Sequence, residues 1–237
     1  MAVNDYLEAA LQAREYLAVA DEAVEAADGG PILDWGCGAG QISHLMVERG
    51  GDVSSFDYDP ESSGAESVPF KRYPELSATR SNDPVRLPYE DASFDVVLSC
   101  GVLEHVAEPL ASLIELRRVL RPGGTLLVYK LPNRFSLLEL VARIGGLPYH
   151  GMRVHDTLWG VRSTRWALDA AGFDVEWVRR SNFLPLTVHH EALTRRADGL
   201  WRLNQRLART PLLQLLDTNV EARAVKPAEV RRREAVS

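Results

Sequence analysis

Hydrophobic and polar positions alternate between two spacings along most of the chain. Short apolar runs, typical of buried strands, are separated by segments in which apolar residues recur every three or four positions, as on one face of a helix. The predicted strands are residues 31–35, 52–59, 93–101, 125–131, 173–180 and 219–226. The predicted helices are residues 4–27, 41–50, 109–120, 137–146, 163–172 and most of 186–216. This alternation predicts a mainly parallel sheet with helices on both faces, the doubly wound α/β class.

Three glycines stand in the loop between the first predicted strand and the helix that follows it. The stretch reads "PILDWGCGAG", with Gly36, Gly38 and Gly40 two residues apart and Asp34 two residues before the first glycine. Glycine costs about 0.5–1 kcal/mol relative to alanine where backbone freedom is not needed, so the cluster indicates a backbone that a ligand approaches closely. In a doubly wound sheet, ligands bind at the carboxyl ends of the strands, where this loop lies.

The glycine spacing argues against a nicotinamide dinucleotide as the ligand. A dinucleotide fingerprint has the pattern G-x-G-x-x-G/A, with the pyrophosphate at the start of the helix. Here the sixth position is Gln41 when counted from Gly36, and Ser43 when counted from Gly38, so the last glycine is missing. A nicotinamide-dependent oxidoreductase therefore remains only as the weaker alternative.

Acidic residues gather in the part of the chain that holds this loop. Residues 1–130 contain 10 Lys/Arg and 22 Asp/Glu, a net charge of −12, whereas residues 131–237 contain 17 and 11, a net charge of +6. The acidic part fits a cationic ligand and argues against broad nucleic-acid binding. The basic part favours an anionic acceptor or an anionic membrane surface, and an unevenly charged solvated surface is the plain alternative.

Two further features bear on the cellular compartment. No apolar run approaches the ~20 residues that a membrane-spanning helix needs, and the N-terminus lacks a basic segment followed by an apolar one. Cys37 and Cys100 are the only cysteines in the sequence, too few for a disulfide framework. We therefore expect a cytoplasmic protein, and we expect no metal site because no zinc-ligand spacing is present.

A series of motifs follows in the order known from one enzyme family. They are "ILDWGCGAGQ", "SSFDYDP", "NDPVRLPYEDASFDVV", "LSCGVLEHV" and "LRRVLRPGGTLLV". Together they resemble the class I S-adenosylmethionine (SAM)-dependent methyltransferases over residues 30–130, and more weakly as far as residue 178. The resemblance implies a Rossmann-like, mainly parallel seven-stranded sheet with a helical lid or insertion in the C-terminal part. It also implies SAM as the cofactor.

The resemblance assigns cofactor contacts to residues of these motifs. Asp57 takes the place of the acid that holds the ribose hydroxyls, and Asp83 that of the acid near the adenine amino group. The expected cofactor-binding residues are Asp34, Gly36, Cys37, Gly38, Gly40, Gln41, Asp57, Tyr58, Asp83, Pro84 and Cys100. Simpler interpretations are a turn at Asp83-Pro84, turn caps at Asp57 and Asp59, and a small buried apolar side chain at Cys100.

Candidate acceptor-side residues follow the strands predicted at 93–101 and 125–131. His105 is the candidate catalytic base, because it lies near the expected donor methyl; packing or orientation is the alternative. Lys130 departs from the family pattern, and either holds an anionic substrate group or is solvated. The expected substrate-binding residues are Lys130, Tyr149, His150, Arg153 and His155, with His189 and His190 as further candidates.

Residues 200–209 show a second amphipathic pattern. One face of this predicted helix carries leucines and another carries arginines, which are Leu200, Leu203, Leu207, Arg202, Arg206 and Arg209. A basic amphipathic helix either lies on an anionic membrane or covers the sheet with its arginines in water.

The resemblance implies methyl transfer from SAM to a small organic metabolite, at oxygen, by metal-free in-line displacement. N- or C-methylation, a lipid-linked or natural-product acceptor, and a non-catalytic SAM-binding protein remain alternatives. We expect one domain over residues 1–237. Its expected parts are a helical cap (1–28), a SAM-binding core (29–130), a substrate-side elaboration with the last strands (131–226) and a disordered tail (227–237).

Overall fold

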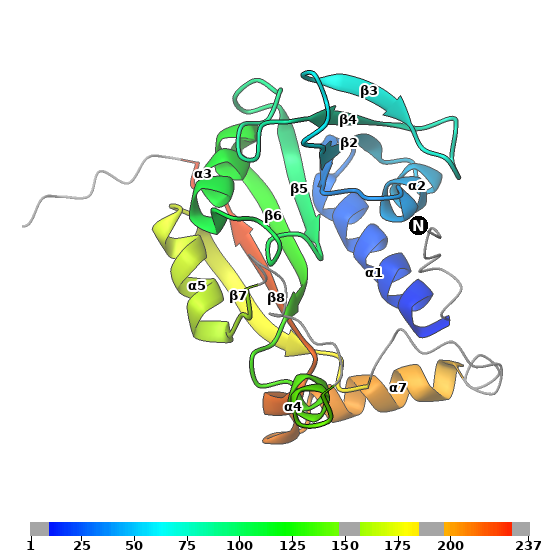
Figure 1. The fold of residues 1–237 in the computed structure, drawn as a ribbon, viewed down its shortest axis with the longest axis vertical. Coiled ribbons are helices and arrows are strands. Elements are labelled where there is room, and N and C mark those ends of the chain that lie inside the picture. The colour runs from blue at the N-terminus through cyan, green and yellow to red at the C-terminus, as the bar shows by residue number, and fades with distance from the viewer. Residues whose placement is uncertain (1–9, 147–156, 185–196, 229–237) are drawn as a thin grey trace, which may run out of the picture.

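The computed structural model of the chain describes residues 10–146, 157–184 and 197–228 (Figure 1). Its helices are α1 (Ala10–Ala27), α2 (Gln41–Glu48), α3 (Pro109–Val119), α4 (Leu137–Ile144), α5 (Val161–Ala170), α7 (Ala197–Ala208) and the short 3-10 helix η1 (Leu213–Leu216). Its strands are β1 (Pro31–Trp35), β2 (Asp52–Tyr58), β3 (Glu66–Pro69), β4 (Ser77–Ser81), β5 (Phe94–Cys100), β6 (Leu120–Pro132), β7 (Asp174–Ser181) and β8 (Asn219–Val225).

The strands form one sheet in the order β3-β4-β2-β1-β5-β6-β8-β7. The four central pairings, from β4 through β2, β1 and β5 to β6, are parallel, whereas β3 and β8 run antiparallel to their neighbours. This arrangement confirms the predicted doubly wound α/β class. Because the chain moves outward from β1 in both directions, the carboxyl ends of β1 and β5 mark the switch point where such sheets bind ligands.

The sheet has eight strands, where seven were expected. The segment between β2 and β5 was predicted as loop, but β4 pairs in parallel with β2, and β3 folds back against β4 at the edge. Their sequences, "ESVP" and "SATRS", are short and mostly polar. Strands at such an edge are partly exposed, so the apolar pattern that identifies buried strands is absent from them.

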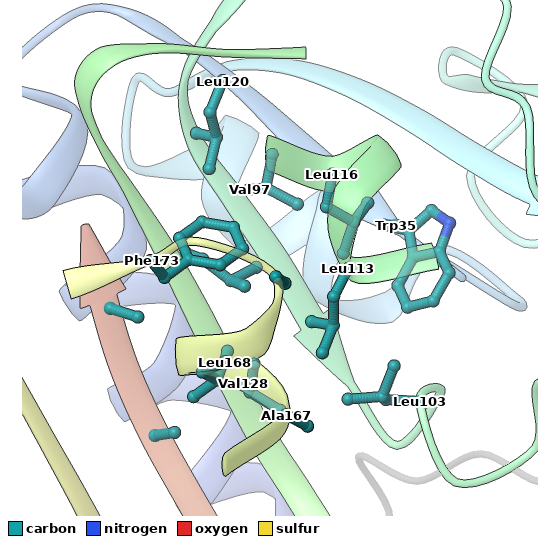
Figure 2. Close-up of a cluster of buried hydrophobic side chains, with 14 of the residues drawn as sticks. Trp35, Val97, Leu103, Leu113, Leu116, Leu120, Val128, Ala167, Leu168 and Phe173 are labelled. Carbon is teal, nitrogen blue, oxygen red and sulfur yellow. The ribbon is translucent and has the colours of Figure 1, made fainter. Parts of the chain in front are cut away.

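Helices cover both faces of the sheet. Alternate residues of the central strands point to opposite faces, so the strands read as nearly continuous apolar runs. Figure 2 shows the cluster on the face of α3 and α5, where Trp35, Val97 and Val128 meet Leu113, Leu116 and Leu168. The cluster on the face of α1 and α2 contains Ile32, Val96, Leu98, Ala20, Leu45 and Met46. Each large buried side chain contributes roughly 1.5–3 kcal/mol to folding, and together they hold the strand ends in place.

The part of the chain after β6 adds helices near the carboxyl edge of the sheet. Ser136 caps α4, since its Oγ accepts a hydrogen bond from the Glu139 backbone N–H. Helix α7 packs near α1 and β7, and η1 leads into β8. Across the described ranges, no helix is long and apolar enough to cross a membrane.

Candidate functional site

The three loop glycines have different surroundings. All three have positive φ, but a Cβ at Gly36 would overlap the Val102 side chain, and one at Gly40 would lie 2.8 Å from the Phe70 ring. A Cβ at Gly38 would meet no atom within 4 Å. Gly36 and Gly40 are therefore explained by packing within the protein, and Gly38 is the glycine that borders open space.

The backbone of this loop is fixed to the neighbouring strand. The N–H groups of Gly36 and Cys37 both donate to the Phe56 carbonyl, at 2.8 and 3.0 Å. The Cys37 side chain packs in a small cluster with Phe70 and Tyr73, and burial raises the pKa of its thiol well above the usual range. The structure thus gives the Cys37 side chain a packing role.

Asp34 is a buried carboxylate held by a chain of hydroxyl groups. Ser43 Oγ donates to Asp34 Oδ2 at 2.6 Å, and Ser55 Oγ donates to Ser43 Oγ at 2.8 Å. The pKa of Asp34 is raised to about 6: burial raises it most, the hydrogen bonds from Ser43 lower it, and the nearby Asp57 raises it. A cation bound beside Asp34 would favour its charged form.

Asp57 stands at the end of β2, beside the open space at Gly38. Its pKa is raised by burial and lowered by Arg80 and by hydrogen bonds from the N–H groups of Tyr58 and Gly38. The Tyr58 N–H lies 3.1 Å from Asp57 Oδ1, and the Tyr58 side chain is exposed. A partly buried carboxylate tied to Gly38 is well placed to accept hydrogen bonds from a ligand that occupies this space.

Two neighbouring acids serve turns, as the simpler interpretation predicted. Asp59 Oδ1 accepts a hydrogen bond from the Glu61 N–H at 3.0 Å. Asp83 is exposed, and its Oδ1 accepts from the N–H groups of Val85 and Arg86 at 2.9 and 2.7 Å. These hydrogen bonds lower the pKa of Asp83. Its expected contact with adenine, like that of the exposed Pro84 beside it, stays a prediction.

Lys130, near the end of β6, has its partners within the protein. Its Nζ lies 3.3 Å from Glu15 Oε2 and 4.9 Å from the centre of the Tyr16 ring. Burial lowers the pKa of Lys130, but Glu15, Tyr16 and Cys100 together raise it by more, so the pKa is raised overall. The expectation of a solvated Lys130 is therefore wrong. Because the charge of Lys130 is already paired with Glu15, the structure gives little support to its expected role in holding an anionic substrate.

Sequence reasoning missed the contribution of α1 to this edge of the sheet. Gln12, Glu15 and Tyr16 lie on the buried face of α1, and burial raises the pKa of Tyr16 to about 12. Glu15 is also bonded by the side-chain amide of Asn182, which follows β7. The sequence contained a signal for this contribution, because polar residues that recur at helical spacing among apolar ones indicate polar contacts within the core. Cys100, at the end of β5, is partly buried. Burial raises the pKa of its thiol, and the nearby positive charge of Lys130 lowers it.

His105 follows β5 and forms a pair with its neighbour. Its Nε2 lies 3.7 Å from Glu104 Oε1, and the imidazole is 46% exposed while Glu104 is buried. The Glu104 carbonyl accepts a hydrogen bond from the Thr157 N–H at 2.8 Å, which ties this loop to the segment before α5. The pair thus combines an accessible imidazole with a fixed carboxylate.

Several expected residues cannot be placed in this site. Tyr149, His150, Arg153 and His155, and the pair at 189–190, lie outside the described residues. Gln41 begins α2 and is buried. Within the ranges that the structure describes, no three His, Cys, Asp or Glu side chains gather as a group that could hold a metal ion.

Helix α7 contains the amphipathic pattern expected at residues 200–209. It buries Asn204 and Ala208, whereas Arg202, Arg206 and Arg209 are exposed. At its N-terminus, Asp198 forms an ion pair with Arg14 of α1. The exposed arginines fit both the membrane and the covering interpretations, whereas Leu203, which is 45% exposed, is not buried against the sheet.

Comparison with known proteins places this site in a family. Residues 33–128 match the family described as "Methyltransferase domain". The chain is 38% identical over 114 residues to a ubiquinone biosynthesis O-methyltransferase of Cereibacter sphaeroides, a match that covers 45% of this chain and 44% of that protein. It is 37% identical over 107 residues to a demethylmenaquinone methyltransferase of Beutenbergia cavernae, covering 45% and 43%. The chain thus spans less than half the length of either relative.

A solved structure shows the same fold over most of the chain. The phosphoethanolamine N-methyltransferase 2 of Haemonchus contortus, in complex with SAM, has a TM-score of 0.56 at 16% sequence identity. The superposition covers 90% of this chain and 52% of that chain. The family match includes the end of β1, the glycine loop, β2 and β5, the elements that build the edge described above. Residues 33–128 therefore form a methyltransferase domain of the class I SAM-dependent type, whose cofactor is SAM.

Proposed function

We propose that the protein transfers the methyl group of SAM to an oxygen atom of a small organic acceptor, by in-line displacement without a metal. The observation that carries the proposal is the open space at Gly38, bordered by the carboxylate of Asp57 and close to that of Asp34. Negative groups around a bare backbone suit a ligand with a sulfonium, an ammonium and ribose hydroxyls. The names of the two curated relatives support a small-molecule acceptor, and one of them supports transfer to oxygen.

The residues around the glycine loop, at the carboxyl ends of β1 and β2, carry chemical groups that suit the cofactor. Asp57 would accept hydrogen bonds from the ribose hydroxyls, and Tyr58 and Asp83 would flank the adenine. Asp34, held by Ser43, would supply negative charge to the cationic end of the ligand. When bound, SAM supplies a methyl group on a positively charged sulfur, which is already a good leaving group. The protein's main task is then to position the acceptor oxygen in line with that methyl.

His105 is the proposed base for the acceptor hydroxyl. Its imidazole is accessible enough to meet an acceptor, and Glu104, 3.7 Å away, would orient the ring and stabilise the imidazolium that forms. The buried position of Glu104 keeps this carboxylate fixed while the proton moves. His105 would thus act as the base, and Glu104 would orient it.

The test combines binding with turnover. Calorimetry should show that SAM binds and that NADH does not. A panel of phenols and quinols, assayed with SAM labelled at the methyl group, should yield a methylated product. His105→Gln should lower kcat about 100-fold or more with little change in the Kd of SAM, because a general base contributes roughly 10²–10⁴-fold. The matched variant His44→Gln, on α2, should keep full turnover. Equal turnover of His105→Gln and the unmodified protein would remove His105 as the base.

A further inference from the structure

Large apolar side chains are exposed on the elements that follow β6. The side chains of Phe135, Leu140, Val141 and Ile144 are 59%, 50%, 54% and 80% exposed. Leu137, Leu203, Leu212 and Leu215 add to this set. A folded protein normally places such side chains inside, and an accumulation of them marks an interaction surface.

Hydrogen bonds hold these elements together. The Asn133 side-chain amide, just before α4, donates to the backbone carbonyls of Leu215 and Asp217 at 3.2 and 2.7 Å. Helix η1 follows α7 closely, and the Gln214 N–H donates to the Thr210 carbonyl at 3.1 Å. In Figure 1, α4 and α7 both lie at the end of the molecule opposite β3. We call residues 134–146 and 199–216 the basic apolar surface.

The charge of this surface has one sign. Its exposed arginines are Arg134, Arg143, Arg202, Arg206 and Arg209. The two segments contain one carboxylate, Glu139, and it is buried. The contrast with the net charge of −12 over residues 1–130 is large. Arginines that flank exposed apolar side chains match the chemistry of a bilayer, with anionic phosphates above an apolar layer.

We propose that the basic apolar surface docks onto a membrane that contains anionic lipids. Side chains such as Phe135 and Ile144 would enter the interface, and the arginines of α7 would contact lipid phosphates. A second copy of the chain fits this surface less well, because a symmetric contact would bring its arginines against the same arginines of the partner. The surface continues directly from the end of β6, so docking would bring the edge that holds His105 close to the bilayer. Access to an acceptor dissolved in the membrane rests on the proposed function, whereas docking itself does not.

Vesicle flotation of the full chain tests the apolar part of the proposal. The protein should float with vesicles of phosphatidylcholine and phosphatidylglycerol at low salt, and much less with phosphatidylcholine alone. Ile144→Ser should weaken binding about tenfold, since a buried isoleucine side chain contributes that much or more. Its control is Trp166→Ser, because Trp166 is 66% exposed on α5, away from this surface. Absence of flotation, or equal losses in the two variants, would overturn the proposal.

The arginines of α7 test the electrostatic part. The double variant Arg202→Gln/Arg206→Gln should weaken binding to anionic vesicles about 25-fold, because each arginine near a charged bilayer contributes roughly fivefold. The control is Arg162→Gln/Arg165→Gln on α5, which makes the same change in net charge at exposed positions. Salt should release the unmodified protein, because it screens these charges.

If light scattering instead shows a dimer that Ile144→Ser dissociates, and no flotation occurs, the surface joins two copies and the membrane proposal is wrong. Loss of SAM binding or methyl transfer would sink the proposed function but leave flotation unchanged.

Discussion

The carboxyl edge of the sheet is built in two different ways along its length. Around β1 and β2, polar contacts join residues that are close in the sequence. Ser43 bonds to Asp34, nine residues away, and Ser55 bonds to Ser43, twelve residues away. Around β6, β8 and β7, they join distant segments, such as Asn182 with Glu15, 167 residues apart. The first region is a loop set on a buried core, whereas the second is a network between α1, α7 and three strands.

Under the proposed function, the first region, around β1 and β2, is the cofactor region, and the second, around β6, β8 and β7, is the acceptor region. The cofactor region needs one fixed backbone shape for one ligand, and contiguous motifs can encode such a shape. The acceptor region depends on how helices after β6 and before β1 meet, so its chemistry depends on tertiary contacts. Variants that disturb one region and leave the other intact can test the distinction.

The largest effect is expected at Gly38. Gly38→Arg should abolish measurable SAM binding, because the side chain would fill the open space beside Asp57. Gly50→Arg is a matched control, since Gly50 also has positive φ and no atom within 4 Å of an added Cβ, but lies at the other end of α2. Calorimetry should show no binding for the first variant and unchanged affinity for the second. Equal affinities would place the cofactor elsewhere.

The second-largest effect concerns stability in the acceptor region. Glu15→Gln should lower the free energy of unfolding by about 3 kcal/mol, because it leaves the largely buried Lys130 without its carboxylate partner. Glu25→Gln, on the exposed face of the same helix, should change it by less than about 0.5 kcal/mol. Urea unfolding measures both. A small loss in both variants would show that the pair between α1 and β6 contributes little.

The sequence predicted the cofactor region more closely than the acceptor region. The positions of β1, β2 and β5 and the glycine loop followed from apolar runs and motif spacing. The packing reasons for Gly36 and Gly40 did not follow, because Val102 and Phe70 come from other segments. The partners of Lys130 were likewise hidden, since a pair between residues 15 and 130 leaves no local pattern. The edge strand β3 and its neighbour β4 escaped notice because strands at this partly exposed end of the sheet carry little apolar surface.

A smaller effect on the cofactor is expected at the end of β2. Asp57→Asn should weaken SAM binding by roughly 1–3 kcal/mol, the scale of hydrogen bonds to a charged group. Asp59→Asn is the control, because Asp59 serves the turn at Glu61 and should leave the Kd of SAM nearly unchanged. The same calorimetric titration compares the two. An Asp57 variant that binds as tightly as the Asp59 variant would contradict the assignment of Asp57.

The smallest expected effect is a pH dependence set by Asp34. Because burial raises its pKa to about 6, Asp34 is mostly protonated at pH 5 and mostly charged at pH 7.5. A cationic ligand favours the charged form, so SAM affinity should rise about tenfold from pH 5 to pH 7 and then level off. Asp34→Asn should bind more weakly at neutral pH and lose most of this dependence. Identical pH profiles for the two proteins would exclude Asp34 as the titrating group.

The most direct test of the central claim is a crystal structure of the protein with S-adenosylhomocysteine. We expect the ribose hydroxyls at Asp57, the adenine toward Asp83, and the sulfur along the loop at Gly38. Adenosine bound at any other edge of the sheet, with the space at Gly38 vacant, would contradict this claim.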